Sequence, residues 1–218
     1  MTRLSGPLQQ AINTIDGAQM LANVERWARI NSGTSNHEGL ARMAQELSEA
    51  FSTLPGEITL EEPAPVTAVD ASGKETAVQN GKHFVLRVRP EAQRRFILTG
   101  HMDTVFPADH PFQELTWLDD AVLNGPGTAD MKGGLAIILA SLTALEQIEA
   151  WQQVGYDVMI NADEETGSLS SAPLIEELAQ DKYAALTFEP AATPEGTLAH
   201  ARGGSGNYSL TVTGKSAH

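Results

Sequence analysis

The chain has 218 residues, of which 14 are Lys or Arg and 28 are Asp or Glu, so its formal net charge is −14. This acidity argues against nucleic acid and anionic membrane as partners, because both require positive charge. The sequence contains no cysteine, which excludes disulfides, cysteine-based zinc sites, iron–sulfur clusters and thiol catalysis. Any metal site must therefore be built from His and carboxylates.

No segment has the pattern of a targeting or membrane-spanning sequence. The first ten residues lack the apolar run of a signal peptide. The most apolar stretch, residues 135–145, is too short to span a bilayer. Hydrophobic residues make up 41% of the sequence, enough for a sizeable core. We therefore expect a cytoplasmic protein, with the periplasm as the alternative.

Two helices are predicted in the first part of the chain. Apolar residues recur at helical spacing over 20–30 and again over 40–51. The polar segment 31–36 between them is predicted as a turn, with Ser35 or Asn36 as the N-cap of the second helix. Pro55-Gly56 ends that helix, and residues 57–81 have the composition of loop and edge strand.

Strands and helices alternate after residue 81. Strands are predicted over 84–88, 95–99, 156–160 and 183–188, and helices over 131–148 and 172–179. This alternation is typical of crossover connections, so we expect an α/β domain with a mostly parallel central sheet flanked by helices.

The character of the sequence changes after Pro190. A linker-like stretch, 191–196, precedes an alternating strand pattern over 207–213. A lone strand cannot close a sheet. We therefore predict one domain over residues 1–193 and the beginning of a second, whose remainder is absent from this chain, over residues 197–218.

Four polar clusters follow predicted strands or glycine-rich turns, where open parallel sheets usually build their sites. They are 101–104 (HMDT), 124–134 (NGPGTADMKGG), 161–167 (NADEETG) and 189–190 (EP). Each cluster alone has an ordinary explanation, such as a solvated acidic turn. Together, His101, Asp130, Glu165 and Glu189 offer one imidazole and three carboxylates, a set suited to zinc, cobalt or manganese.

Two further acidic residues have positions that suggest roles beside such a metal. Asp103 stands two residues after His101 and could fix the tautomer of the imidazole. Glu164 and Glu165 are adjacent, so their side chains point apart, and one could bind metal while the other serves as a base.

Other catalytic patterns fail in this sequence. The segment 124–134 lacks the Gly-Lys-Ser/Thr ending of a phosphate-binding loop, and Asp130 replaces the last Gly of a dinucleotide fingerprint. The acids at 163–165 lack the offsets of an EF-hand calcium loop. The segment 203–207 is one Gly short of a nucleophile elbow.

The four clusters, in this order, resemble the motifs of the M20 family of metallopeptidases. The likeness runs from about Ala18 and is greatest to the glutamate carboxypeptidase branch. The sequence is also similar to the acetylornithine deacetylase and succinyl-diaminopimelate desuccinylase branch. Residues 213–218 look like the first strand and His of the lid, or dimerisation, domain of that family. The resemblance implies a zinc-exopeptidase-like catalytic fold.

A set of metal ligands is implied by this resemblance. Two zinc ions are expected per active site, with Co²⁺ or Mn²⁺ as possible replacements. Asp130 would bridge the two ions, His101 and Glu189 would complete one of them, and Glu165 would bind the other. The last metal-binding His of the family and the Arg that binds the substrate carboxylate are expected beyond residue 218.

The resemblance also implies roles for residues that do not bind metal. Asp103 would orient the imidazole of His101, and Glu164 would be the general base. His218 would reach into the neighbouring subunit's active site and stabilise the oxyanion, in a homodimer formed through the lid domain. A cis peptide bond is expected between Asp130 and Met131.

The implied activity is metal-dependent hydrolysis of peptide or amide C–N bonds. The first expectation is a carboxypeptidase that releases a C-terminal amino acid of the glutamate type. An N-acyl-amino-acid deacylase is the alternative, so the substrate would be a small peptide or an N-acyl amino acid. A non-catalytic relative that binds metal or peptide stands outside the enzyme class, and the presence of Glu164 argues against it, because a binding protein has no use for a base.

Overall fold

The computed structural model describes residues 5–70, 72–193, 195–199, 201, 203, 204, 206, 210, 212, 214 and 215. These residues form two compact units, one from residues up to 64 together with 80–190, the other from 65–79 together with the described residues after 190. Most of the strand predicted over 207–213, and His218, lie outside the described residues. The domain boundaries expected from the sequence therefore stay a prediction.

The larger unit holds most of the regular structure. Its helices are α1 (Gly6–Ile12), α2 (Gly17–Ala28), α3 (His37–Phe51), α4 (Gly133–Leu145) and α5 (Ala172–Ala179). Its strands are β1 (Glu57–Glu61), β4 (His83–Val88), β5 (Arg95–His101), β6 (Thr116–Asp119), β7 (Val122–Asn124), β8 (Gly155–Asn161) and β9 (Ala184–Thr187). Short helical turns are η1 (Thr128–Lys132), η2 (Glu149–Gln153) and η3 (Glu164–Thr166).

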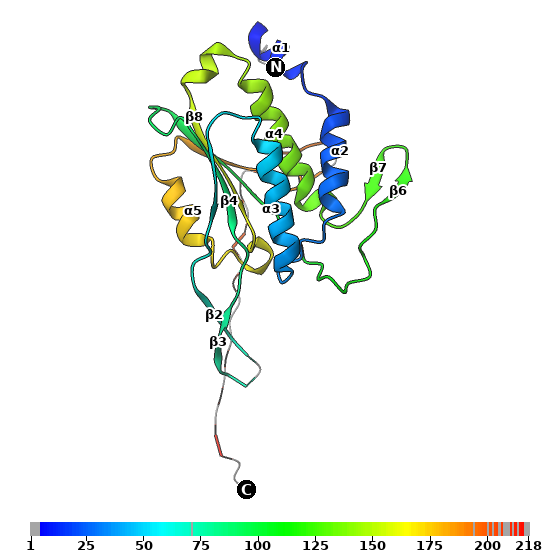
Figure 1. Cartoon of the computed structure of the whole chain (residues 1–218), viewed down its shortest axis with the longest axis vertical. Coiled ribbons are helices and arrows are strands. Elements are labelled where there is room, and N and C mark those ends of the chain that lie inside the picture. Colours follow the sequence, from blue (N-terminus) through cyan, green and yellow to red (C-terminus); the bar gives the residue numbers. More distant parts are fainter. Residues whose placement is uncertain are drawn as a thin grey trace. The chain divides into compact units, whose positions relative to one another are not determined.

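The main sheet has the strand order β1-β4-β8-β5-β9 (Figure 1). Strand β8 pairs parallel with β5, and β5 pairs parallel with β9, whereas β1/β4 and β4/β8 are antiparallel. The expected α/β class is confirmed, with a mixed sheet in place of a mostly parallel one. The reason lies in the connections: a short turn over 89–94 reverses the chain between β4 and β5, whereas a crossover through α4 returns it parallel to β5 in β8.

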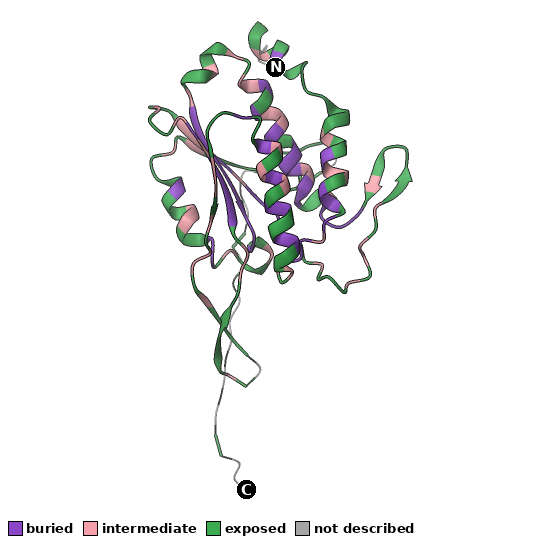
Figure 2. Ribbon diagram, in the orientation of Figure 1, coloured by how far each residue is buried: buried purple, intermediate pink, exposed green. Residues whose placement is uncertain are grey.

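Helices cover both faces of this sheet (Figures 1 and 2). Helices α2, α3 and α4 pack on the face that carries Phe84, Leu86 and Val158. Helix α5 packs on the opposite face, where Val85 and Met159 point. Strand β8 is buried along its whole length, as expected of the central strand. The strands therefore alternate their side chains between two apolar layers.

Helix α4 is the most apolar of these helices. By length and composition the window Thr128–Leu145 could cross a membrane, but half of it is buried inside this unit, as in the core helix of a globular domain. Leu135, Ile138 and Leu142 are fully buried against the sheet. The predicted helix over 131–148 is thus confirmed over Gly133–Leu145; the residues before Gly133 form the separate turn η1, and residues 146–148 lie beyond the helix.

Several smaller elements were not predicted as such. Helix α1 begins after its N-cap Ser5, and β6 and β7 form a two-stranded antiparallel sheet. In the smaller unit, β2 (Val66–Val69) and β3 (Glu75–Val78) form a hairpin within the region predicted as loop and edge strand. The side chain of Asp70 closes that hairpin by accepting hydrogen bonds from the backbone of Ser72 and Lys74.

Candidate metal centre

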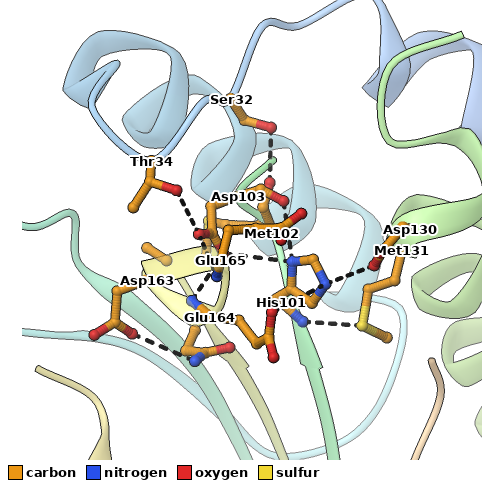
Figure 3. A network of polar contacts seen from close by, with 12 residues as sticks. Ser32, Thr34, His101, Met102, Asp103, Asp130, Met131, Asp163, Glu164 and Glu165 are labelled. Atoms are coloured by element: carbon orange, nitrogen blue, oxygen red, sulfur yellow. Dashed lines mark hydrogen bonds and ion pairs between the residues drawn. The ribbon is translucent and has the colours of Figure 1, made fainter. Parts of the chain in front are cut away.

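The predicted site residues meet at the carboxyl ends of the parallel strands (Figure 3). His101 is the last residue of β5, and Glu164 and Glu165 lie in η3, which begins three residues after the end of β8. Glu189 lies two residues after β9, and Asp130 lies in η1, directly before α4. Because parallel strands end at one edge of the sheet, residues far apart in the sequence become neighbours there.

The imidazole of His101 is the buried centre of this group, with 1% of its surface exposed. Its Nε2 atom lies 2.9 Å from Oδ1 of Asp130, 3.8 Å from Oε1 of Glu189 and 4.0 Å from Oε2 of Glu164. Its Nδ1 atom lies 3.0 Å from the backbone oxygen of Asp103 and 3.4 Å from the carboxylate of the same residue. An Nδ1–H that donates to Asp103 leaves Nε2 free to act as a ligand.

Two sets of three side chains bring their ligand atoms within 4.8 Å of one another. One set is His101, Asp130 and Glu165, and the other is His101, Glu164 and Glu189. The four candidate ligands predicted within this chain, His101, Asp130, Glu165 and Glu189, thus lie in one cluster with Glu164, the predicted base. Their distribution between two ions stays a prediction.

The pKa values in this cluster test whether a cation fits. Burial alone would lower the pKa of His101, but the hydrogen bond and charge of Asp103, with further contributions from Glu189 and Asp130, raise it to about 9. Burial, joined by nearby carboxylates, raises the pKa of Glu165 to about 7, although His101 opposes the shift. Burial likewise raises the pKa of Glu189.

These shifts have one electrostatic meaning. The cluster contains more negative carboxylates than positive groups to balance them. The imidazole of His101 therefore keeps its proton to a higher pH, because its positive charge stabilises the carboxylates around it. A divalent cation at Nε2 would supply that charge instead, and imidazole and carboxylate oxygen are ligands that zinc accepts. The residues therefore fit a metal ion. Roughly half of the Asp130 and Glu164 side-chain surfaces are exposed, so the centre is open to solvent.

Asp103 lies in the loop that follows His101 at the end of β5, and it contacts the turn η3, which carries Glu164 and Glu165. Its buried carboxylate accepts hydrogen bonds from the backbone N–H of Glu164 at 3.2 Å and of Glu165 at 3.1 Å. The hydroxyl of Thr34 donates to Oδ2 of the same carboxylate at 2.7 Å. Asp103 thus contacts the imidazole and the backbone of both glutamates, a wider role than the orientation of His101 that the sequence suggested.

A second buried carboxylate fixes the loop that follows η3. Asp163 accepts hydrogen bonds at Oδ2 from the backbone and hydroxyl of Ser170, at 2.7 and 2.8 Å. The fully buried His83 contacts the other end of this segment: its Nδ1 accepts a hydrogen bond from the backbone N–H of Ala162 at 3.2 Å. These contacts hold both ends of the segment that carries Glu164 and Glu165.

The segment of Asp130 is held by close backbone packing. The peptide bond between Asp130 and Met131 is cis, as the resemblance implied. Gly127, which precedes η1, has φ +69°, a conformation that favours glycine. Gly134 lies so close to the carbonyl of Phe188 that an added Cβ would be 2.0 Å from that oxygen. The sulfur of Met131 lies 3.2 Å from the backbone nitrogen of His101, so η1 also contacts the end of β5.

The structure thus brings together His101, Asp103, Asp130, Glu164, Glu165 and Glu189, the predicted site residues among those described. His218 lies outside the described residues. Sequence reasoning did not single out Thr34, and it named Met131 only for the cis peptide bond and not for the contact of its sulfur with His101. The only sequence signal for Thr34 was the polar composition of 31–36, which predicted a turn. The predicted N-cap is confirmed at Asn36, whose side chain accepts a hydrogen bond from the backbone N–H of Gly39 at the start of α3.

Comparison with known families and sequences agrees with this geometry. A family model described as peptidase family M20/M25/M40 matches residues 97–214. Carboxypeptidase G2 from Pseudomonas sp. (strain RS-16) is 28% identical over 203 residues, covering 91% of this chain and 45% of that protein. Succinyl-diaminopimelate desuccinylase from Ruthia magnifica subsp. Calyptogena magnifica is 32% identical over 137 residues, covering 56% of this chain and 35% of that protein.

Solved structures show the same fold at low identity. Human carnosine dipeptidase 1 has a TM-score of 0.64 at 19% identity and covers 86% of this chain and 42% of its own. An M20 family metallo-carboxypeptidase from Sulfolobus solfataricus has a TM-score of 0.61 at 19% identity, covering 82% of this chain and 39% of its own. The chain spans less than half the length of these relatives.

Proposed function

The chain belongs to the peptidase family M20/M25/M40, whose model matches more than half of it, and we propose that it carries the metal ligands and the base of an amide hydrolase. The observation that supports this most directly is the cluster at the carboxyl ends of β5, β8 and β9, where one imidazole and four carboxylates form two sets of three whose ligand atoms lie within 4.8 Å of one another.

His101, Asp130, Glu165 and Glu189 would hold the metal, which we propose is zinc, in two positions bridged by Asp130. Zinc there would polarise the scissile carbonyl and lower the pKa of water from 15.7 toward about 7. Glu189 is less exposed than Asp130, with 22% of its side-chain surface accessible against 54%. Asp130 is therefore the candidate ligand most open to an entering ion, whereas His101 is buried and Glu189 is half-buried.

Glu164 is the proposed general base. Its carboxylate lies at the edge of the cluster, 4.0 Å from His101 Nε2, and its side chain is 46% exposed. Its backbone is fixed by the hydrogen bond to Asp103. A carboxylate that is held at its backbone but free at its tip can take a proton from water and transfer it to the leaving amine.

We propose a C-terminal glutamate-type residue of a small peptide as the first substrate class. The carboxypeptidase G2 match supports it, because that match covers 91% of this chain. A deacylase of N-acyl amino acids is the second candidate, supported by the desuccinylase match and by acetylornithine deacetylase from Vibrio campbellii, 30% identical over 151 residues. We also propose, from the family resemblance, a homodimer of the full-length protein formed through the lid domain that begins at about residue 197, with His218 serving the partner's site.

The test combines metal content with hydrolysis in the full-length protein. Zinc-loaded protein is assayed on N-acyl-glutamates and Xaa-Glu dipeptides, and in parallel on N-acetylornithine and N-succinyl-diaminopimelate. We expect Glu164→Gln to abolish turnover with zinc content unchanged, because Gln cannot accept the proton. Asp130→Ala should lose both ions, and Glu176→Gln, an exposed change on α5, should alter neither property. Full turnover in Glu164→Gln would refute the base, and hydrolysis of none of the substrates would refute the proposed activity.

A further inference from the structure

The segment Asn31–Thr34, which joins α2 to α3, lies along residues 102–106, the loop that follows β5. The N–H of Thr104 donates to the carbonyl of Ser32 at 3.0 Å, and the N–H of Thr34 donates to the carbonyl of Thr104 at 3.2 Å. Gly33 and Thr104 form a parallel bridge between these hydrogen bonds. The segment therefore pairs with the loop of the metal centre as a short strand would.

The side chains of this segment are directed to the same loop. The hydroxyl of the buried Ser32 donates to the carbonyl of Met102 at 2.7 Å. The amide of Asn31 donates to the carbonyl of Phe106 at 3.0 Å. At Gly33 an added Cβ would lie 2.3 Å from that same Phe106 oxygen, so a side chain cannot fit. A turn that only joined two helices would need none of these contacts.

Thr34 is the member of the segment that contacts a residue of the metal centre. Its hydroxyl is 2.7 Å from Oδ2 of Asp103, the shortest hydrogen bond to that carboxylate in the part of the chain that the structure describes (Figure 3). The other donors to the carboxylate are the backbone N–H groups of Glu164 and Glu165. The ring Nδ1 of His101 lies 3.4 Å from Oδ1 of this carboxylate and 3.0 Å from the backbone oxygen of Asp103. Asp103 is 1% exposed, so water does not replace a lost donor freely.

We propose that Thr34 is a positioning residue of the metal centre, which acts by fixing the carboxylate of Asp103 and through it the imidazole of His101 and the backbone of Glu164 and Glu165. A carboxylate is rigid and planar, so rotation about its last bond moves both oxygens at once. Without the hydroxyl, Oδ2 keeps only the N–H of Glu165, and the contact between Oδ1 and the ring loosens with it. This inference rests on the proposed metal-dependent function.

The test measures zinc affinity, which does not depend on any substrate. Zinc is titrated against a competing chelator in the full-length protein and in Thr34→Val, which has nearly the same shape but no hydroxyl. We expect affinity to fall about 10-fold, the lower end of the range for partners of metal ligands. Thr34→Ser, which keeps the hydroxyl, should restore affinity to within about twofold. Thr53→Val removes a hydroxyl that bonds only its own helix end, at Ala50, and should leave affinity unchanged.

A double-mutant cycle separates positioning from a loss of stability. In the Asp103→Ala background, Thr34→Val should have no further effect on zinc affinity, because the group it acts through is gone. Urea denaturation of the metal-free proteins shows whether the variants are folded. Equal zinc affinity in Thr34→Val and the parent protein would overturn the inference, as would equal losses in Thr34→Val and Thr34→Ser. If the substrates are not hydrolysed but the affinity pattern holds, the proposed activity fails and the positioning role stands.

Discussion

Replacement of Gly134 with Ala tests how closely α4 must approach the end of β9. A Cβ at this position would lie 2.0 Å from the carbonyl oxygen of Phe188, which is 1.4 Å inside the 3.4 Å where ordinary contact begins. The obstacle is backbone, which cannot turn aside as a flexible side chain can. Either α4 or the segment that carries Glu189 must shift.

The expected cost follows from two opposing effects. Overpacking costs about 3 kcal/mol at the upper end of its usual range, whereas Ala in place of Gly inside a helix gains about 1 kcal/mol. The net loss is then about 2 kcal/mol in the free energy of unfolding. Because Glu189 directly follows Phe188, zinc affinity should fall as well.

Urea denaturation of the metal-free protein gives the free energy of unfolding, with Gly17→Ala as the matched control. Gly17 is the first residue of α2, and nothing lies within 4 Å of a Cβ built there. The control should be neutral or slightly stabilising. If Gly134→Ala were as stable as Gly17→Ala and bound zinc as tightly as the parent, the close approach of α4 to Phe188 would not constrain the site.

Three further predictions concern charge and metal. Burial lowers the pKa of His83, so as the pH falls the unfolded chain binds a proton at this residue before the folded protein does. The free energy of unfolding should therefore fall as the pH drops below about 6.5. In His83→Gln the slope of that free energy against pH should be smaller. Lys182→Met should cost about 3–5 kcal/mol in urea denaturation, because it leaves Asp157 buried without its partner at 2.7 Å, and adding Asp157→Leu should recover most of the loss. A chelator should lower the melting temperature reversibly, since zinc at 100 times its Kd stabilises by about 2.7 kcal/mol; an unchanged melting temperature would contradict a folded-state metal site.

Local sequence patterns predicted the regular elements well where one face had to be buried. The helix over 172–179 was predicted at its observed bounds, and the strands of the core were found within a few residues. Strand order was not predictable in the same way, because the position of β8 between β4 and β5 depends on pairing across the whole unit. Short elements such as α1 and β6 lack the long periodic pattern that a prediction needs.

The residues of the candidate site likewise differ in how far local sequence could predict them. The candidate ligands were predicted because three of them follow predicted strands, Asp130 lies in a glycine-rich turn before a helix, and their order matches a known set of motifs. Thr34 was predicted only as part of a turn, because its role depends on a contact with Asp103, 69 positions away in the sequence. Similarly, nothing in the local sequence indicated that Gly134 would meet the carbonyl of Phe188.

The place of β8 in the sheet has a consequence for how the protein folds. Strands β4 and β5 are joined by a short turn, yet in the native sheet they are separated by β8, which begins only at residue 155. During synthesis β4 can pair with β1 on one edge, but its other edge has no native partner until β8 follows. A hairpin of β4 with β5 at that edge would have to open to admit β8. Long-range pairing of this kind is slow. Glu164 and Glu165 reach His101 only when β8 has inserted, so capture of zinc during refolding should report the completion of the sheet centre and follow, not precede, the collapse of the helices.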